Sequence, residues 1–82
     1  MPSLYEINLQ REILREKSAE ILADYIRFFN KNGEDNKIIE KWYNTVEYIH
    51  THIFDPEYNS LEKLKEANGK LDLALEVLKK LS

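Results

Sequence analysis

The spacing of apolar residues along the chain predicts three helices and no strands. The first predicted helix covers about residues 3–30, where apolar residues recur every seven positions and the places between them lie on the same face. Ser3 and Glu6 fit the capping box that starts a helix, and Gly33 suits the conformation that closes one. The residues of this face are Leu4, Ile7, Leu14, Ser18, Ile21, Leu22, Tyr25, Phe28 and Phe29.

The second predicted helix covers about residues 36–54. Asp35 or Asn36 can cap its start, and Pro56 disfavours helical geometry in the residue before it. We expect Trp42 to be the large filler of the core, with Tyr43 and Phe54 at its edge. The core stripe is formed by Ile39, Trp42, Val46, Ile49 and Ile53.

The third predicted helix covers about residues 57–81. It begins either at Asp55-Pro56, a cap followed by proline, or at Asn59 with Glu62 three residues on. Asn68-Gly69 is a turn signal that would divide this region and give four helices. The apolar register continues across it without a slip, which favours one long helix. The stripe is formed by Leu61, Leu64, Asn68, Leu71, Leu75 and Leu78.

Short connections place consecutive helices antiparallel to each other. The sequence therefore predicts an all-α, up-down-up three-helix bundle that fills residues 1–82 as a single helical domain, with the first and third helices parallel. A chain of 82 residues has a thin core, and such small domains gain stability from association.

Composition excludes several function classes. Twelve basic and fifteen acidic residues give a net charge of −3, without the basic surface that nucleic-acid binding needs. The chain has no cysteine, so disulfides and thiolate metal sites are excluded. Its apolar runs are far shorter than a membrane span, and no secretory signal is visible, so we expect a cytoplasmic protein. Abundant isoleucine and lysine suggest an AT-rich genome, from a mobile element or an archaeon.

Two helices carry apolar residues off the core face. Tyr5, Leu9 and Ile13 form a second stripe on the first helix, and Leu73 with Val77 forms one on the third. A surface helix needs only one apolar stripe, and clustered exposed apolar residues mark interfaces. We expect these five residues to contact a protein partner or a second copy. Because the two stripes lie near opposite ends of parallel helices, a two-fold homodimer could pair them.

Two further groups of residues are predicted as secondary contacts. An acidic row follows one face of the first helix, where like charges four residues apart repel each other and a basic partner would compensate. Tyr48 and His52 are also four apart on the exposed side of the second helix, and tyrosine is enriched in interface cores. The acidic row is formed by Glu12, Glu16, Glu20 and Asp24.

The sequence gives little support for metal binding or catalysis. Glu47 and His50 match the Glu-x-x-His spacing of di-iron bundles, but those sites need two such motifs and two further glutamates. We expect His50 at the edge of the core, and neither a metal nor a cofactor. Gly33 and Gly69 stand alone, so no phosphate-binding loop is present, and we expect no enzymatic activity.

The leading hypothesis is a non-enzymatic helical adaptor or accessory subunit that acts by protein–protein association and associates with itself. A second hypothesis is a small acidic immunity protein, antitoxin or inhibitor that neutralises a basic target surface. Strong weakening of binding by salt would favour the second, because salt screens exposed charges. A third is a metal-dependent oligomer that uses Glu47 and His50, which metal analysis of the purified protein would test.

Overall fold

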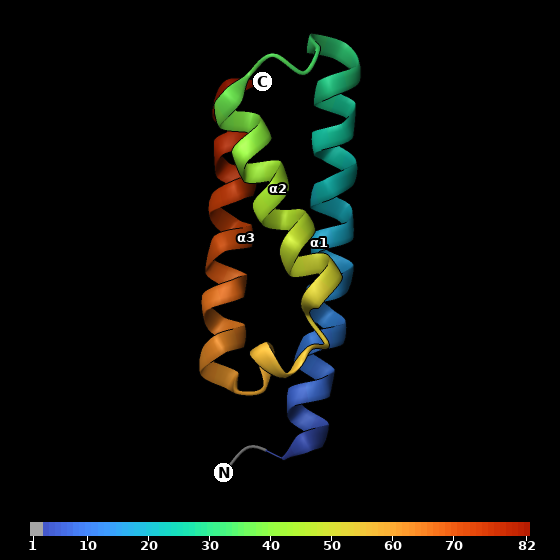
Figure 1. Cartoon of the computed structure of the whole chain (residues 1–82), viewed down its shortest axis with the longest axis vertical. Coiled ribbons are helices and arrows are strands. Elements are labelled where there is room, and N and C mark those ends of the chain that lie inside the picture. Colours follow the sequence, from blue (N-terminus) through green and yellow to red (C-terminus); the bar gives the residue numbers. More distant parts are fainter. Residues whose placement is uncertain (1–2) are drawn as a thin grey trace.

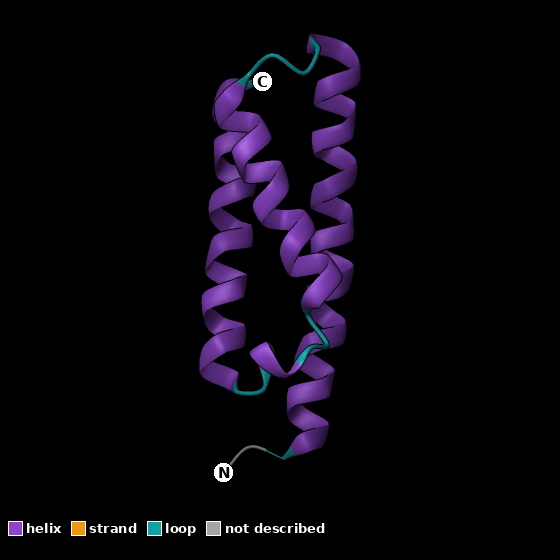
Figure 2. Cartoon of the chain, viewed as in Figure 1, coloured by secondary structure: helices purple, strands orange, loops and turns teal. Residues whose placement is uncertain are grey.

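The fold is described by a computed structural model of residues 3–82. The helices are α1 (Leu4–Asn32), α2 (Lys37–His52), the short 3-10 helix η1 (Pro56–Tyr58) and α3 (Leu61–Leu81). Figure 1 shows α1 and α3 running in the same direction, with α2 antiparallel to both. Residues 3–82 form only helices and the loops between them (Figure 2). The predicted up-down-up three-helix bundle is confirmed.

Local signals set the ends of the first two helices. Ser3 Oγ accepts a hydrogen bond from the backbone N–H of Glu6 at 3.2 Å, which is the expected N-terminal cap. Gly33 has a φ of 82°, and its N–H donates to the carbonyl of Phe29. Asn36 caps α2, since its side-chain oxygen accepts from the amides two and three residues later. α1 ends two residues later than predicted, and α2 ends two residues earlier.

The start of the third helix differs from the prediction at residue 57 and lies one residue after the alternative start, which used Asn59 as the cap. Pro56 begins η1 instead, and α3 begins at Leu61, where Ser60 Oγ accepts from the amide of Lys63 at 3.2 Å. The short η1 places Tyr58 over the end of the core, where it is buried. α3 continues without interruption through Gly69. The alternative of four helices, with a break at Asn68-Gly69, is therefore wrong.

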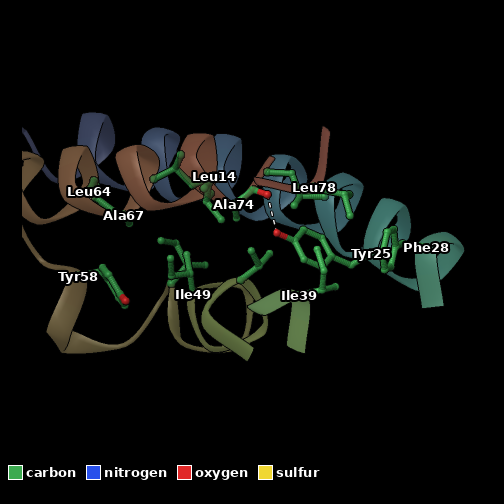
Figure 3. Close-up of a cluster of buried hydrophobic side chains, with 14 residues drawn as sticks. Leu14, Tyr25, Phe28, Ile39, Ile49, Tyr58, Leu64, Ala67, Ala74 and Leu78 are labelled. Atoms are coloured by element: carbon green, nitrogen blue, oxygen red, sulfur yellow. Dashed lines mark hydrogen bonds between the residues drawn. The ribbon is translucent and has the colours of Figure 1, made fainter. Parts of the chain in front are cut away.

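The core is filled by a different set of side chains than the sequence suggested. Tyr25 is its largest fully buried side chain, and its hydroxyl donates to the carbonyl of Ala74 (Figure 3). Trp42 is only partly buried and packs against the edge of the core, so the prediction that it fills the core is wrong. On α3, small residues alternate with leucines in the buried stripe and let the helices approach closely. That stripe consists of Leu64, Ala67, Leu71, Ala74 and Leu78.

The longest helix extends beyond its neighbours. At 1.5 Å per residue, the 29 residues of α1 span about 44 Å, which matches the 45 Å long axis of the molecule. The 21 residues of α3 span only about 32 Å. The first turns of α1 therefore project past η1 and the start of α3 (Figure 1).

Arg11 marks the point where α1 meets the rest of the bundle. Its Nε donates to the carbonyl of Tyr58 at 2.9 Å, and one terminal nitrogen donates to the carbonyl of Asp55 at 3.1 Å. The same guanidinium lies 6.0 Å from the centre of the Phe54 ring. Of residues 3–10, only Ile7 is partly covered and the others are exposed. Across the described chain, each helix is too short or too polar to cross a membrane.

Candidate interface with a protein partner

The N-terminal part of α1 carries an exposed apolar surface that begins on its projecting turns. Tyr5 is 75% exposed, and Leu9 and Ile13 are each 46% exposed. Ile7 and Leu14 lie on the other side of the helix and pack against or within the core. The three exposed residues therefore form the second stripe that the sequence predicted, and they are called the N-terminal face below. Its role as an interface stays a prediction.

The second predicted stripe is less complete. Leu73 is 51% exposed, whereas Val77 is partly buried against the core. The two residues are four apart on α3, and the helix is oriented so that only the first stands clear of the bundle. This side of α3 therefore offers one exposed leucine rather than a continuous apolar stripe.

Half of the acidic row is paired within α1. Glu12 contacts Arg15 at 2.8 Å, and Asp24 contacts Arg27. Within residues 3–82, Glu16 and Glu20 form no ion pair. The sequence prediction overlooked the arginines three residues after each paired acid, although such spacing favours contact on a helix. The unpaired charge of the row is concentrated in its middle.

Tyr48 and His52 use their polar groups within the chain. Their rings lie 4.4 Å apart between centroids. The Tyr48 hydroxyl donates to Glu57 Oε2 at 2.6 Å, and this hydrogen bond is the main cause that raises the pKa of Tyr48 to about 12. His52 Nδ1 lies 2.6 Å from Asp55 Oδ2. These contacts connect the end of α2 to η1, while Tyr48 remains 47% exposed and accessible to a partner.

Glu47 and His50, the Glu-x-x-His pair, contact different parts of the chain. His50 Nδ1 lies 2.9 Å from Ser18 Oγ and 3.2 Å from the carbonyl of Arg15, so it joins α2 to α1 at the edge of the core. Glu47 instead lies near Tyr43, and burial, together with the nearby Glu47 carboxylate, raises the pKa of the Tyr43 hydroxyl. Residues 3–82 bring together no group of three or more histidine or carboxylate side chains that could hold a metal. The geometry gives the metal hypothesis no support.

A hollow opens beside the N-terminal face, and the sequence prediction did not include it. It lies between α1 and α3 and has a volume of about 380 Å³. We call it the α1–α3 hollow. The hollow depends on how two helices are placed relative to each other, so the spacing of apolar residues within either helix does not reveal it. Its lining residues are Gln10, Ile13, Leu14, Lys17, Leu61, Leu64, Lys65 and Asn68.

Comparison with protein families adds the decisive observation. The family model for bacterial epsilon antitoxins matches residues 3–81. The chain belongs to the bacterial epsilon antitoxin family. The antitoxin matches no curated protein and no solved structure. Epsilon antitoxins are not enzymes, and they bind and neutralise zeta toxins by protein–protein association.

Family membership decides between the hypotheses drawn from the sequence. The predictions of a non-enzymatic protein and of a protein partner are confirmed. The second hypothesis, which included an antitoxin, fits better than the leading one of an adaptor or accessory subunit. Epsilon antitoxins belong to toxin–antitoxin systems of the mobile-element type. The bacterial family therefore favours a mobile element over an archaeon as the origin of the chain.

Proposed function

We propose that this antitoxin neutralises a zeta toxin by laying the N-terminal face of α1 against it. The observation that carries the proposal is the exposure of Tyr5, Leu9 and Ile13 along the N-terminal part of α1, from its projecting first turns to the point where it meets α3. A helix that presents apolar residues in this way suits recognition in a groove of a partner. A tyrosine and two branched aliphatic side chains are also suitable anchors, because their burial supplies binding free energy.

The charges beside this face give the complex its orientation. Glu16 and Glu20 lie further along α1 without an ion pair in the described chain, so they are free to meet basic groups of the toxin. Complementary charges of this kind steer association and fix the register more than they add to affinity. We therefore expect salt to weaken binding only moderately, since the apolar anchors supply most of the affinity. A steep loss of affinity with salt would instead favour the acidic row as the main contact.

Two variants, each with more than one substitution, test the proposal. Replacing Tyr5, Leu9 and Ile13 by alanine should weaken binding to purified zeta toxin by on the order of a hundredfold, because three apolar anchors are removed. The matched control replaces Ile26 and Ile38, which are 47% and 56% exposed toward the other end of the bundle. The control should bind like the wild type. Equal affinities for both variants would contradict the proposal.

Self-association is a second candidate, and the exposed Leu73 favours it. The N-terminal face and Leu73 lie on parallel helices, with Leu73 in the later half of α3. An antiparallel two-fold dimer would place each against the other, twice. Sedimentation tests this: the wild type should have the mass of a dimer, and the variant with Leu9→Glu and Leu73→Glu that of a monomer. A monomeric wild type would exclude the dimer without affecting toxin binding.

A further inference from the structure

The N-terminal face turns toward α3 as it follows α1. Positions four residues apart on an α-helix differ by about 40°, so the face rotates steadily from Tyr5 through Leu9 to Ile13. Ile13 belongs both to this face and to the wall of the α1–α3 hollow. A continuous apolar surface therefore passes from the projecting turns of α1 onto the first turns of α3.

The hollow has an apolar floor and a basic rim. Leu14 and Leu64, each 3% exposed, form its floor. On the rim, Lys17 Nζ is already engaged, because it contacts Asn68 Oδ1 at 2.7 Å and also pairs with Asp72. Among the described residues, Lys65 forms no ion pair. The rim thus offers one unpaired ammonium group directly beside an apolar depression.

The area that a stable complex needs also points beyond α1. A standard interface buries about 800 Å² on each partner, which is about one seventh of the 5705 Å² surface of the described chain. A whole aromatic side chain buries only about 150–250 Å². Three side chains that are partly covered already do not reach the required area. The surface that continues from them without a break is the α1–α3 hollow.

We infer that the zeta toxin inserts an apolar side chain into the α1–α3 hollow and sets a carboxylate against Lys65. This inference rests on the proposed function, because it extends the same docking face. The hollow has the volume of a small ligand pocket and holds a side chain of the size of leucine or phenylalanine. The charges along this surface fix the orientation in which the toxin binds. Its basic groups meet the side of α1 that carries Glu16, and its carboxylate meets α3.

Two lysines of the same helix provide the test. Lys65→Glu and Lys70→Glu change the net charge of the antitoxin equally, but Lys70 lines a different groove, between α3, η1 and α2. Binding to purified zeta toxin is measured by titration calorimetry. Lys65→Glu should raise the Kd by about tenfold or more, because it places like charges opposite each other. Lys70→Glu should change it by less than about twofold, and Lys65→Arg should retain the affinity of the wild type.

A separate variant tests the insertion of an apolar side chain into the α1–α3 hollow. Gln10 stands on the rim of the hollow and is exposed, so Gln10→Trp should cover the hollow, leave the fold intact and weaken binding by about tenfold. Circular dichroism of each free variant checks the fold. If either rim variant were unstable, Lys65→Gln at the exposed rim would serve instead, with a smaller loss of affinity expected.

The results separate this inference from the proposed function. Loss of affinity in Lys65→Glu and Gln10→Trp, but not in Lys70→Glu, supports the inference. If Lys65→Glu binds like Lys70→Glu and Gln10→Trp like the wild type, while the triple alanine variant of the N-terminal face fails to bind, the inference is overturned and the proposed function stands. If the triple alanine variant itself binds like the wild type, both are overturned.

Discussion

The substitution of leucine by alanine at two positions of α1 distinguishes a residue that contributes to toxin binding from one that contributes to folding. Leu9 belongs to the N-terminal face and is 46% exposed, whereas Leu14 is 3% exposed and belongs to the core. Both lie in the interior of the same helix, so Leu→Ala changes intrinsic helix propensity equally at the two sites. We predict that Leu9→Ala weakens toxin binding with little change in stability, and that Leu14→Ala destabilises the free antitoxin.

The magnitudes follow from the exposed fractions. Burying a leucine side chain completely is worth about 1.5–3 kcal/mol. Since 46% of Leu9 remains for the toxin to cover, its removal should cost about 0.7–1.4 kcal/mol of binding free energy, or about three- to tenfold in Kd. Leu14→Ala leaves a cavity in the core and should lower the free energy of unfolding by about 2.7–5 kcal/mol. In a domain of this size, that corresponds to a Tm lower by about 10 °C or more.

The assay measures both quantities on both variants. Thermal unfolding of the free antitoxin is followed by circular dichroism, and the Kd is measured by titration with purified zeta toxin. For Leu9→Ala we expect a loss of stability below about 1 kcal/mol, as is usual for exposed positions. The reasoning would be refuted by a Leu9→Ala variant with unchanged Kd, or by one whose Tm falls as far as that of Leu14→Ala.

Three other predictions concern the fold. Gly69→Ala should raise the free energy of unfolding in urea by about 1 kcal/mol, because an added Cβ meets nothing within 4 Å; a destabilised variant would contradict the open space beside α3. Burial raises the pKa of Tyr25 from 10.0 to about 12. The buried neutral hydroxyl therefore contributes its full stabilisation below pH 10. This stabilisation is lost as the pH rises from 10 to 12, by up to about 1.4 kcal/mol per pH unit. Tyr25→Phe should therefore flatten the alkaline fall of Tm, and an unchanged slope would count against the burial of this hydroxyl. Asn36→Ala should cost about 1 kcal/mol in urea unfolding through the lost cap of α2, whereas Asn36→Ser should be nearly neutral.

The caps of the first two helices and the continuity of α3 were predicted well because they depend on residues that are close together in the sequence. Ser3, Asn36 and Gly33 act through backbone groups one turn away, so short patterns reveal them. The continuity of α3 through Gly69 followed from an apolar register that both halves share. The start of α3 was misplaced because Pro56 suits the first turn of any helix, and sequence alone does not show that η1 stops after one turn.

The composition of the core was harder to predict because it depends on the rotation of each helix about its axis. The apolar period gives the width of a stripe, but the neighbouring helices decide which edge of it is covered. Trp42 lies at the exposed edge of its stripe for this reason, while Tyr25 reaches the carbonyl of Ala74 on another helix. Ala67 and Ala74 were overlooked because small residues give a weak apolar signal, although close helix packing requires them.

The candidate interface could be predicted in part. The exposure of Tyr5, Leu9 and Ile13 was predictable because they are apolar and lie opposite a stripe that already fills the core; their role as an interface stays a prediction. Val77 satisfied the same criterion, but the orientation of α3 turns it partly against the core. The apolar spacing within one helix could not reveal the α1–α3 hollow, since the hollow forms between two helices that residues 33–60 separate along the chain.

Hydrogen exchange of the antitoxin, free and bound to zeta toxin, tests directly whether the N-terminal face docks on the toxin. The amides of residues 4–10 lie on turns whose side chains, except that of Ile7, are exposed in the free protein, and such segments open readily. If the N-terminal face is the docking surface, these amides should exchange much more slowly in the complex, together with those of the first turns of α3. Protection confined to α2 and η1, with unchanged exchange in residues 4–10, would contradict this docking surface.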